Sequence, residues 1–315
     1  MKTHFLQSKA WQTFQEAMGR TVYFREGEGW QYRAILEPGT RLAPARLYCP
    51  YGPTAINQRA LNTALESLKA LAASTDATFV RVQPLGVESG EFSHEKLGLK
   101  QIEYSQPADT WCIDLTQDEE TIIANMKQSN RNIYRNYHKK GLSYRSSVDS
   151  DEISHLLRLI KQTAERNNIS AHSDNYLVTQ AKSLIPIGAA TLHFIEHEGK
   201  IIAAALTYNT DETTYYAHAS ADFKHRKLGA STALVAEIIL RAKKNGRKTC
   251  DLYGITTSED SQHPWVGFTK FKKSFGGYHI PLSHTYDLPI KSGLYRTYSL
   301  AKRSRALSQK LRKLL

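Results

Sequence analysis

The chain of 315 residues is 41% hydrophobic and 23% charged, which excludes a disordered protein, and its length favours two domains over one core. Its start resembles no secretory signal, no apolar run reaches the roughly 18 residues that span a bilayer, and its three scattered cysteines lack metal-site spacing, so we expect a cytosolic protein without a metal. The net charge of +12 favours an anionic partner such as nucleic acid, anionic lipid or a phosphorylated substrate.

The first half of the chain predicts a β-hairpin, a strand, a helix and a further strand. Segments 21–25 and 30–36 alternate between apolar and polar residues around Glu26-Gly27-Glu28-Gly29. A short strand is expected at 47–49, a helix at 55–73 from the spacing of its leucines, and a closing strand at 78–82.

The second half repeats this order about 170 residues later. We expect a hairpin, a third strand, a helix that ends before Gly246, and a closing strand; the segments are 191–197, 201–208, 213–219, 228–245 and 249–253. Such an order fits the GNAT acyltransferase fold. The sequence therefore predicts an α/β protein of two tandem GNAT-like domains with a cleft between them, where sites usually lie.

Between the two halves, residues 117–140 are predicted as one helix. Thr116 and Glu119 have the spacing of a capping box, and Gly141 supplies the stop. Cationic residues at helical spacing form one basic stripe with a further lysine at its end: Lys127, Arg131, Arg135, His138 and Lys139. The stripe is either a solvated helix face or a surface that binds tRNA phosphates.

The C-terminal tail is the most basic part of the chain. Residues 291–315 hold eight Lys and Arg and no acid, two-thirds of the surplus charge. Residues 294–315 predict an amphipathic helix whose apolar face carries Leu300, Leu307, Leu311 and Leu314. This helix lies either on an anionic membrane surface or on its own domain.

Six segments, in order along the chain, resemble motifs of the Fem peptidyltransferases, and the last of them is the most specific. They are Phe5-Leu6-Gln7-Ser8 with Trp11, Tyr48-Cys49-Pro50-Tyr51-Gly52-Pro53, Val80-Arg81-Val82-Gln83-Pro84, Arg131-Asn132-Ile133-Tyr134-Arg135-Asn136 with Lys139-Lys140-Gly141, Asp251-Leu252-Tyr253-Gly254-Ile255 and Gly267-Phe268-Thr269-Lys270-Phe271-Lys272-Lys273-Ser274-Phe275-Gly276-Gly277.

The resemblance implies two GNAT-like domains, the first (1–115) completed by the C-terminal segment (281–315) and the second spanning 116–280. It implies a tRNA-dependent aminoacyltransferase of interpeptide bridge formation in cell-wall synthesis. Aminoacyl-tRNA is the implied donor and the stem peptide of a peptidoglycan precursor the acceptor, with no cofactor and no metal. The long coiled-coil arm of some Fem proteins has no counterpart in 180–280, and we expect a monomer.

By resemblance, Lys272 is the catalytic cation, and Phe271 stands beside it. The reaction is aminolysis of an ester, so a fixed ammonium would stabilise the tetrahedral oxyanion. We expect 270–273 to be extended, so that Lys270 shares a face with Lys272, ahead of the tight turn Phe275-Gly276-Gly277. A solvated lysine is the alternative.

The chain departs from the family pattern at positions implied to bind substrate. Gln83 stands where relatives often carry a carboxylate, and an amide takes no proton near neutral pH, so the general base is left open. His172 stands in place of an Arg, and Thr13 in place of a Lys, that grip nucleotide phosphates in some relatives. These losses favour lipid II over UDP-MurNAc-pentapeptide as the acceptor, unless Lys9, Arg81 or the basic helix takes over the phosphate contacts.

Other candidates for substrate contact are less specific. Tyr216 and His218 alternate along segment 213–219, so they share one face. Tyr176 follows His172 in the loop region, and Trp11 belongs to the N-terminal motif. A core-packing role for Tyr216 and a solvated position for His172 stay open.

Two rival functions remain at this stage. An acyl-CoA-dependent GNAT transferase needs a Gly-rich pyrophosphate turn, of which Arg226-Lys227-Leu228-Gly229-Ala230 is a shortened fragment. A tRNA-binding protein of the same fold without catalysis is the other. The transferred amino acid, the number added and the acceptor position cannot be predicted from motifs.

Overall fold

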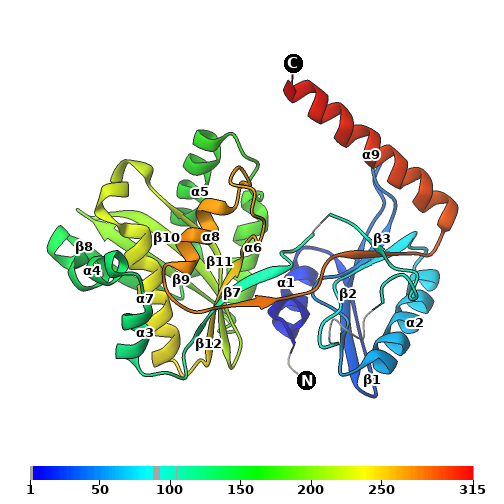
Figure 1. Ribbon diagram of the computed structural model, residues 1–315, viewed down its shortest axis with the longest axis horizontal. Coiled ribbons are helices and arrows are strands. Elements are labelled where there is room, and N and C mark those ends of the chain that lie inside the picture. Colours follow the sequence, from blue (N-terminus) through cyan, green and yellow to red (C-terminus); the bar gives the residue numbers. More distant parts are fainter. Residues whose placement is uncertain (1–2, 88–92, 104, 315) are drawn as a thin grey trace. The chain divides into compact units, whose positions relative to one another are not determined.

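The computed structural model describes residues 3–87, 93–103 and 105–314, without the side chains of 305–307 and 309–314. It divides into two compact units, one formed by Met1–Gln106 with Ser283–Leu315 and one by Pro107–Leu282 (Figure 1). The strand β7 (Asp109–Asp114) falls within the residues expected to form the first domain. This strand pairs with strands of the second sheet, so the division between the units falls before Pro107.

The first unit is a mixed sheet in the order β1-β2-β3-β5-β14-β6, with β4 paired to β2. Its strands are β1 (Thr21–Gly27), β2 (Trp30–Glu37), β3 (Arg46–Cys49), β4 (Thr54–Ala55), β5 (Phe79–Val82), β6 (Lys100–Gln101) and β14 (Tyr286–Pro289). β3 and β5 run parallel, and the other pairs of named strands described in this sheet are antiparallel. The strand β14 comes from the C-terminal segment and lies between β5 and β6, so residues far apart in the chain complete this sheet.

Two helices accompany this sheet, α1 (Lys9–Ala17) and α2 (Gln58–Ser74). The leucines that predicted the second helix are all buried against β-strand residues of the unit: Leu61, Leu65, Leu68 and Leu71. The helix begins at Gln58 rather than 55, because Thr54–Ala55 pairs with β2 and the Asn57 side chain caps the first turn by accepting from the Ala60 amide at 2.9 Å.

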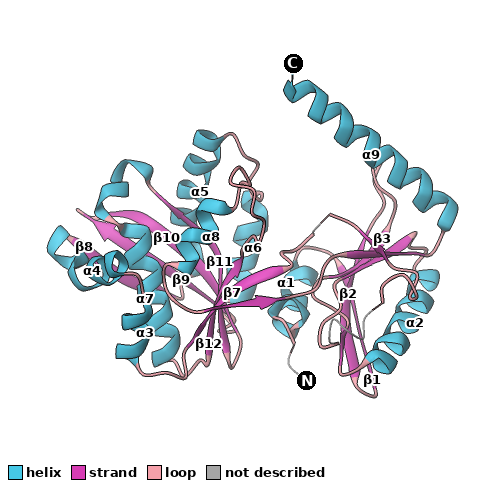
Figure 2. Cartoon of the chain, viewed as in Figure 1, coloured by secondary structure: helices cyan, strands magenta, loops and turns pink. Residues whose placement is uncertain are grey.

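The second unit holds a seven-stranded sheet in the order β13-β7-β12-β11-β10-β9-β8 (Figure 2). The remaining strands are β8 (Leu142–Ser147), β9 (Ala190–His197), β10 (Lys200–Asn209), β11 (Thr213–Ala221), β12 (Thr249–Gly254) and β13 (Tyr278–Pro281). The hairpin, third strand and closing strand therefore lie within one to two residues of the predicted segments.

The helices α5 (Ile153–Asn167) and α7 (Ala230–Lys244) pack on the sheet of the second unit, and α6 (Asp174–Leu184) packs beside α5. Successive residues of β9 show that α5 and α7 cover opposite faces. Phe194 meets His155 of α5 with ring centroids 5.8 Å apart, whereas Ile195 belongs to the core that α7 supplies. The three cysteines are buried and free.

The segment predicted as one helix over 117–140 is broken into α3 (Glu119–Asn125), α4 (Gln128–Asn136) and a 3₁₀ turn (Tyr137–Lys140). Met126 is extended and buried because the next amide, that of Lys127, donates to the Ser274 carbonyl at 2.8 Å. The predicted capping box is also wrong: Asp118 caps α3, and the Thr116 side chain instead donates to Asp114. The stop at Gly141, in the left-handed conformation, is confirmed.

The tail forms the helix α9 (Ser292–Leu314). Its first turns dock on the first unit, because Tyr295 and Tyr298 lie 5.3 and 5.5 Å from the Phe79 ring. Leu294 and Leu300 are 56% and 55% exposed, so docking leaves apolar surface on this helix uncovered. The other leucines of the predicted apolar face lie outside the described side chains.

Candidate active site

A cavity of about 1180 Å³ lies within the second unit. It begins where β11 and β12 separate: these parallel strands pair only as far as Tyr215 and Asp251, and residues 216–222 and 253–254 then line the cavity. Ligands of α/β proteins bind at the carboxyl ends of parallel strands, because the diverging chains leave space there. The cavity therefore marks the candidate site.

Five of the predicted site residues line this cavity, and a sixth stands next to it. The five are Lys272, Phe271, Tyr216, His218 and His172. Tyr176 stacks on His172 with ring centroids 4.7 Å apart. These residues come from α8, β11, α6 and the segment before α6, so tertiary structure brings together side chains that the sequence keeps up to 100 positions apart.

Lys272 lies on α8 (Val266–Lys273), which corrects the expectation of an extended segment. In a helix, Lys270 is turned about 200° away from Lys272, so the two do not share a face. Buried Thr269 and the cavity-lining Phe268 occupy the preceding turn on the Lys272 side. The helix ends at Lys273, and in the turn that follows, a Cβ on Gly277 would overlap the Cys112 carbonyl oxygen.

The Lys272 ammonium is held in a poorly solvated position. Its Nζ donates to the carbonyl of Gly254, the last residue of β12, at 2.5 Å. Burial lowers the pKa of Lys272 to about 8, and the negative charge of Asp251 acts in the opposite direction. At neutral pH the group is therefore mostly protonated and poorly hydrated, the state in which a cation interacts most strongly with a developing oxyanion.

Asp251 is a functional candidate to which the sequence analysis gave no role. It is 6% exposed on β12, and its Oδ1 accepts from the Thr110 hydroxyl and, at 2.7 Å, from the Tyr253 amide. A buried carboxylate usually has a cationic or hydrogen-bonded partner. An acid inside a strand of otherwise buried apolar residues was the signal that pointed to it.

Two histidines of the cavity wall, His172 and His218, have lowered pKa values. Burial lowers the pKa of His218 to about 3, and partial burial also lowers the pKa of His172. Tyr208 donates its hydroxyl to Gln180 at 3.0 Å, so its oxygen accepts from His218 Nε2 at 2.9 Å. This arrangement places the His218 proton on Nε2 and leaves Nδ1 as an acceptor.

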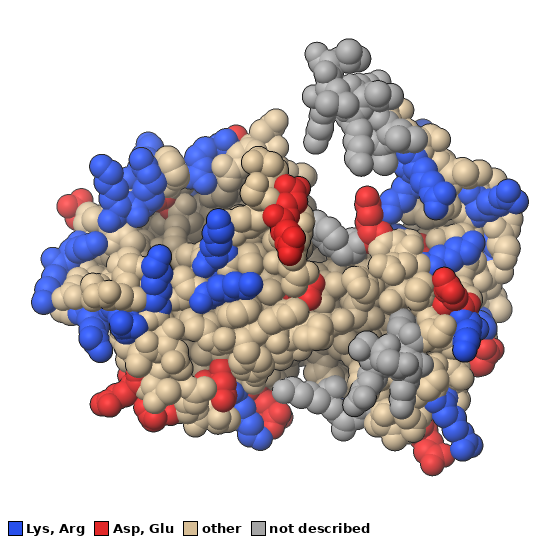
Figure 3. Space-filling view, in the orientation of Figure 1, with Lys and Arg blue, Asp and Glu red and all other residues tan. Residues whose placement is uncertain are grey.

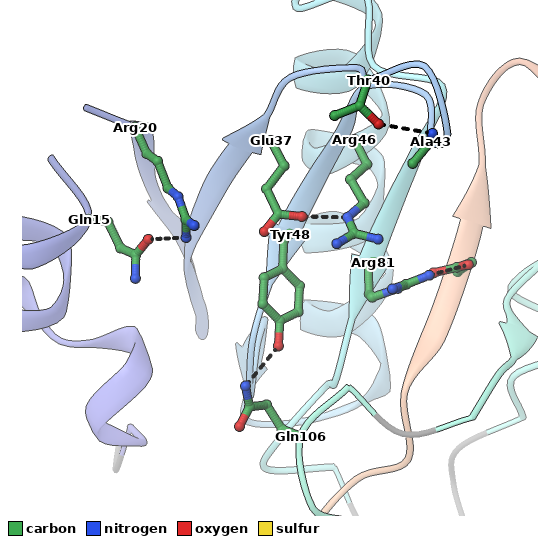
Figure 4. A network of polar contacts seen from close by, with 10 residues as sticks. Gln15, Arg20, Glu37, Thr40, Ala43, Arg46, Tyr48, Arg81 and Gln106 are labelled. Atoms are coloured by element: carbon green, nitrogen blue, oxygen red, sulfur yellow. Dashed lines mark hydrogen bonds and ion pairs between the residues drawn. The ribbon is translucent and has the colours of Figure 1, made fainter. Parts of the chain in front are cut away.

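Three predicted substrate residues belong to the first unit and have structural partners there. Trp11 is 7% exposed and packs against Phe14 with centroids 4.9 Å apart. Arg81 makes a bidentate ion pair with Asp287 of β14 at 2.8 and 3.0 Å, seen in Figure 4 where Arg81 extends toward that strand. Gln83 is fully buried; its Nε2 donates to the carbonyls of residues 106 and 283, and its Oε1 has no hydrogen bond to a described residue.

The predicted basic stripe lies entirely after the break, on the N-cap of α4, on α4 itself and on the 3₁₀ turn that follows. Lys127, Arg135 and Lys139 are exposed, so they stay available to an anion. Arg131 instead turns back and donates to the carbonyls of Ala124, at 2.8 Å, and Met126, which end α3. Lys and Arg side chains are frequent on the face of the second unit that carries α4 and α8 (Figure 3).

The described part of the chain contains no cluster of three or more His, Cys, Asp or Glu that could hold a metal ion. Within the same residues, no helix is long and apolar enough to cross a bilayer.

The FemAB family profile matches residues 86–183 and 187–303, most of the chain. The chain belongs to the FemAB family. No curated protein matches it by sequence. Family membership supports a transferase of peptidoglycan bridge synthesis.

Solved structures agree on the fold. The crystal structure of FemX is 18% identical, covers 93% of this chain and 94% of its own, and superimposes with a TM-score of 0.81. The C-terminal domain of a putative lysylphosphatidylglycerol synthetase from Agrobacterium fabrum is 12% identical over 96% of this chain and 92% of its own, with a TM-score of 0.61. A tandem GNAT protein of clavulanic acid biosynthesis is 15% identical over 86% and 83%, with a TM-score of 0.50. The predicted fold of two tandem GNAT-like domains is confirmed.

Proposed function

We propose that this FemAB-family protein transfers an amino acid from aminoacyl-tRNA to the stem peptide of a peptidoglycan precursor. The observation that carries the proposal is Lys272: its partly desolvated ammonium lines a cavity of about 1180 Å³, large enough for the aminoacylated end of a donor. No cofactor or metal takes part in the proposed reaction.

In the proposed step, a free amine of the stem peptide attacks the ester carbonyl that joins the amino acid to the terminal ribose. A C–N bond forms, the C–O bond to the ribose breaks, and the proton lost by the amine ends on the ribose oxygen. Lys272 stays protonated and donates to the oxyanion of the tetrahedral intermediate. One of its N–H groups serves Gly254, which leaves two for the intermediate.

His218 is proposed to orient the amine rather than to remove its proton. A histidine with a pKa of about 3 is a weak base at neutral pH, but its Nδ1 lone pair accepts a hydrogen bond without competition from a bound proton. Gln83 has no basic group, so the proton reaches the leaving oxygen through the substrates themselves.

The proposed acceptor is lipid II, and the proposed location is the cytoplasm with peripheral contact at the inner membrane face. Support comes from the tail: α9 docks through Tyr295 but leaves Leu300 exposed, on a segment with eight cations and no acid. Cations of this kind attract anionic lipid, and an exposed leucine inserts at the interface. The protein is proposed to act as a monomer.

The test supplies purified protein with lipid II and a pool of charged tRNAs carrying labelled amino acids. We expect label on the stem peptide that RNase treatment of the donor abolishes. Equal labelling from free amino acid with ATP, or from acetyl-CoA, would reject the proposal. The acetyl-CoA arm also tests the rival that the fragment Arg226-Lys227-Leu228-Gly229-Ala230 raises. A protein that binds tRNA without transfer would instead be the non-catalytic alternative.

A further inference from the structure

An unusual arrangement of side chains lies on the wall of the same cavity, away from the residues that the family motifs mark. The Phe223 ring, 49% exposed, is flanked by the guanidiniums of Arg166 at 4.2 Å and Arg226 at 4.1 Å from its centroid. One face of a phenyl ring has no room for two guanidiniums at that height, so they lie on opposite faces. All three residues line the cavity.

These two cations have no carboxylate partner among the described residues. Arg166 Nε donates to the Asn167 side chain at 3.2 Å, and Arg226 Nη1 donates to the Phe223 carbonyl at 3.2 Å. Asp222, the acid next to Phe223, already accepts from the Lys224 amide at 2.8 Å and pairs with His225 at 3.1 Å. Two like charges held on one ring repel each other, and an anion that binds both relieves the repulsion.

The surroundings favour a phosphate over a carboxylate ligand. Each guanidinium has a planar fork of donors that fits phosphate oxygens, and most of these donors are unused. The first turn of α7 lies on the same wall, and its cap, Gly229, brings no side chain across that turn. Trp265 and the 63% exposed Phe268 add aromatic surface within the cavity.

Arginines interleaved with aromatic rings in a basic groove are typical of single-stranded nucleic acid binding, since phosphates meet the cations and bases stack on the rings. We propose that Arg166, Phe223 and Arg226 form a phosphate clamp for the single-stranded RNA end of the donor. The clamp rests on the proposed function, because it would hold the RNA while its ester reaches Lys272. In this proposal, the segment around Gly229, which resembles part of a pyrophosphate turn, binds RNA rather than acyl-CoA.

The test measures binding of an uncharged, fluorescently labelled single-stranded RNA that ends in CCA, as a function of salt. For the double variant Arg166→Gln and Arg226→Gln, we expect about tenfold weaker binding and a log–log salt slope smaller by about 1.4, since each phosphate contact on a single strand contributes about 0.7. Phe223→Leu keeps both charges and loses the platform that orients them, so it should weaken binding without changing the slope as much.

The matched control is Lys161→Gln with Lys224→Gln. These exposed lysines lie on α5 and on the 3₁₀ turn that carry the two arginines, and neither lines the cavity, so the control removes the same charge from the same elements. Thermal melting of both double variants checks the fold. Equal losses in the two double variants, or wild-type binding by the arginine variant, would overturn the clamp.

Two further arms separate this inference from the proposed function and from other phosphates. Uridine diphosphate and coenzyme A are titrated against the same variants; if either binds through the arginines while RNA does not, the clamp for RNA is rejected. Transfer from charged RNA is then measured. Transfer with an unchanged KM in the arginine variant rejects the clamp alone. Arginine-dependent RNA binding without transfer in the wild type rejects the proposed function and keeps the clamp.

Discussion

Both units contain one parallel pair of strands, and the two pairs end differently. In the first unit, β3 and β5 pair over all four residues, and the chain beyond them stays hydrogen-bonded, with the Gln83 amide donating to Gly52 and the Leu85 amide to Pro53, both at 2.9 Å. In the second unit, β11 and β12 pair over three residues and then separate around the cavity. The cavity of the second unit therefore lies where its parallel strands part.

Each unit also places a cation and an acid near its closing strand. The two groups bond each other in the first unit, whereas the cation of the second unit bonds a carbonyl. Arg81 and Asp287 neutralise each other in a buried bidentate pair, to which Tyr295 adds a hydrogen bond at 3.1 Å. Lys272 bonds a carbonyl, with no ion pair to a described residue, and Asp251 acts on it through its charge. The first pair stabilises a fold, and the second leaves an ammonium that retains donors for a ligand. Four predictions test this contrast.

The largest effect is expected for Arg81→Met. It leaves the Asp287 carboxylate buried without its partner, so we expect the free energy of unfolding of the first unit to fall by about 3–5 kcal/mol. Denaturant unfolding with hydrogen exchange resolved by unit measures it. The double variant Arg81→Met with Asp287→Leu should recover most of the loss, because a buried pair replaced by apolar groups costs little. A loss below about 1 kcal/mol would mean that the pair behaves as an exposed one.

Lys272→Met should lower the single-turnover transfer rate about 10²–10³-fold with little change in unfolding free energy. Methionine keeps the length of the side chain and removes the charge and the donors. Lys270→Met is the control, since Lys270 is exposed on the far side of the same helix. Lys273 lies over the Trp111 ring at 5.1 Å, so its replacement tests packing instead. If the variants at Lys272, Lys270 and Lys273 lose activity equally, Lys272 has no special role, and its contrast with the structural cation Arg81 fails.

Asp251→Asn should make the transfer rate more sensitive to alkaline pH. The Asp251 charge raises the pKa of Lys272, so its removal lowers that pKa, and the protonated ammonium is then lost at a lower pH as pH rises. We expect little change at pH 6 and a loss of about tenfold near pH 8, read from single-turnover rates across pH. Thr110→Val removes a hydrogen bond to Asp251 but no charge, and should leave the profile in place. If the pH profile of the transfer rate is not shifted in Asp251→Asn, the Asp251 charge does not act on the pKa of Lys272.

The smallest effect is expected at the exposed cations of the second unit. The triple variant combines Lys127→Gln, Arg135→Gln and Lys139→Gln. Each phosphate contact that it loses should reduce the log–log salt slope of tRNA binding by about 0.7–0.9. Filter binding at several salt concentrations measures it. Arg131→Gln is the comparison, because Arg131 bonds the last carbonyls of α3 and should lower stability rather than the slope. An unchanged slope in the triple variant would leave those cations as a solvated surface.

The sequence by itself determined the order of hairpin, strand, helix and closing strand that recurs in both units, because alternation and leucine spacing are local properties of the chain. The hairpins, the closing strands and the helix marked by Leu61 and Leu65 follow from these patterns. The motifs likewise marked Lys272 and its neighbour Phe271, which line the cavity.

Tertiary structure decided the features that depend on contacts between residues distant in the sequence. The long basic helix breaks at Met126 because the following amide bonds Ser274, a partner that periodicity does not encode. Arg81 forms an ion pair with Asp287, which lies 206 residues away in the sequence. The two arginines on Phe223 come from separate helical segments. The pKa of Lys272 depends on burial and on Asp251, which reaches it only when β12 and α8 pack together. Charge and burial at a site are sums over neighbours in space, so the sequence names candidates and the fold selects among them.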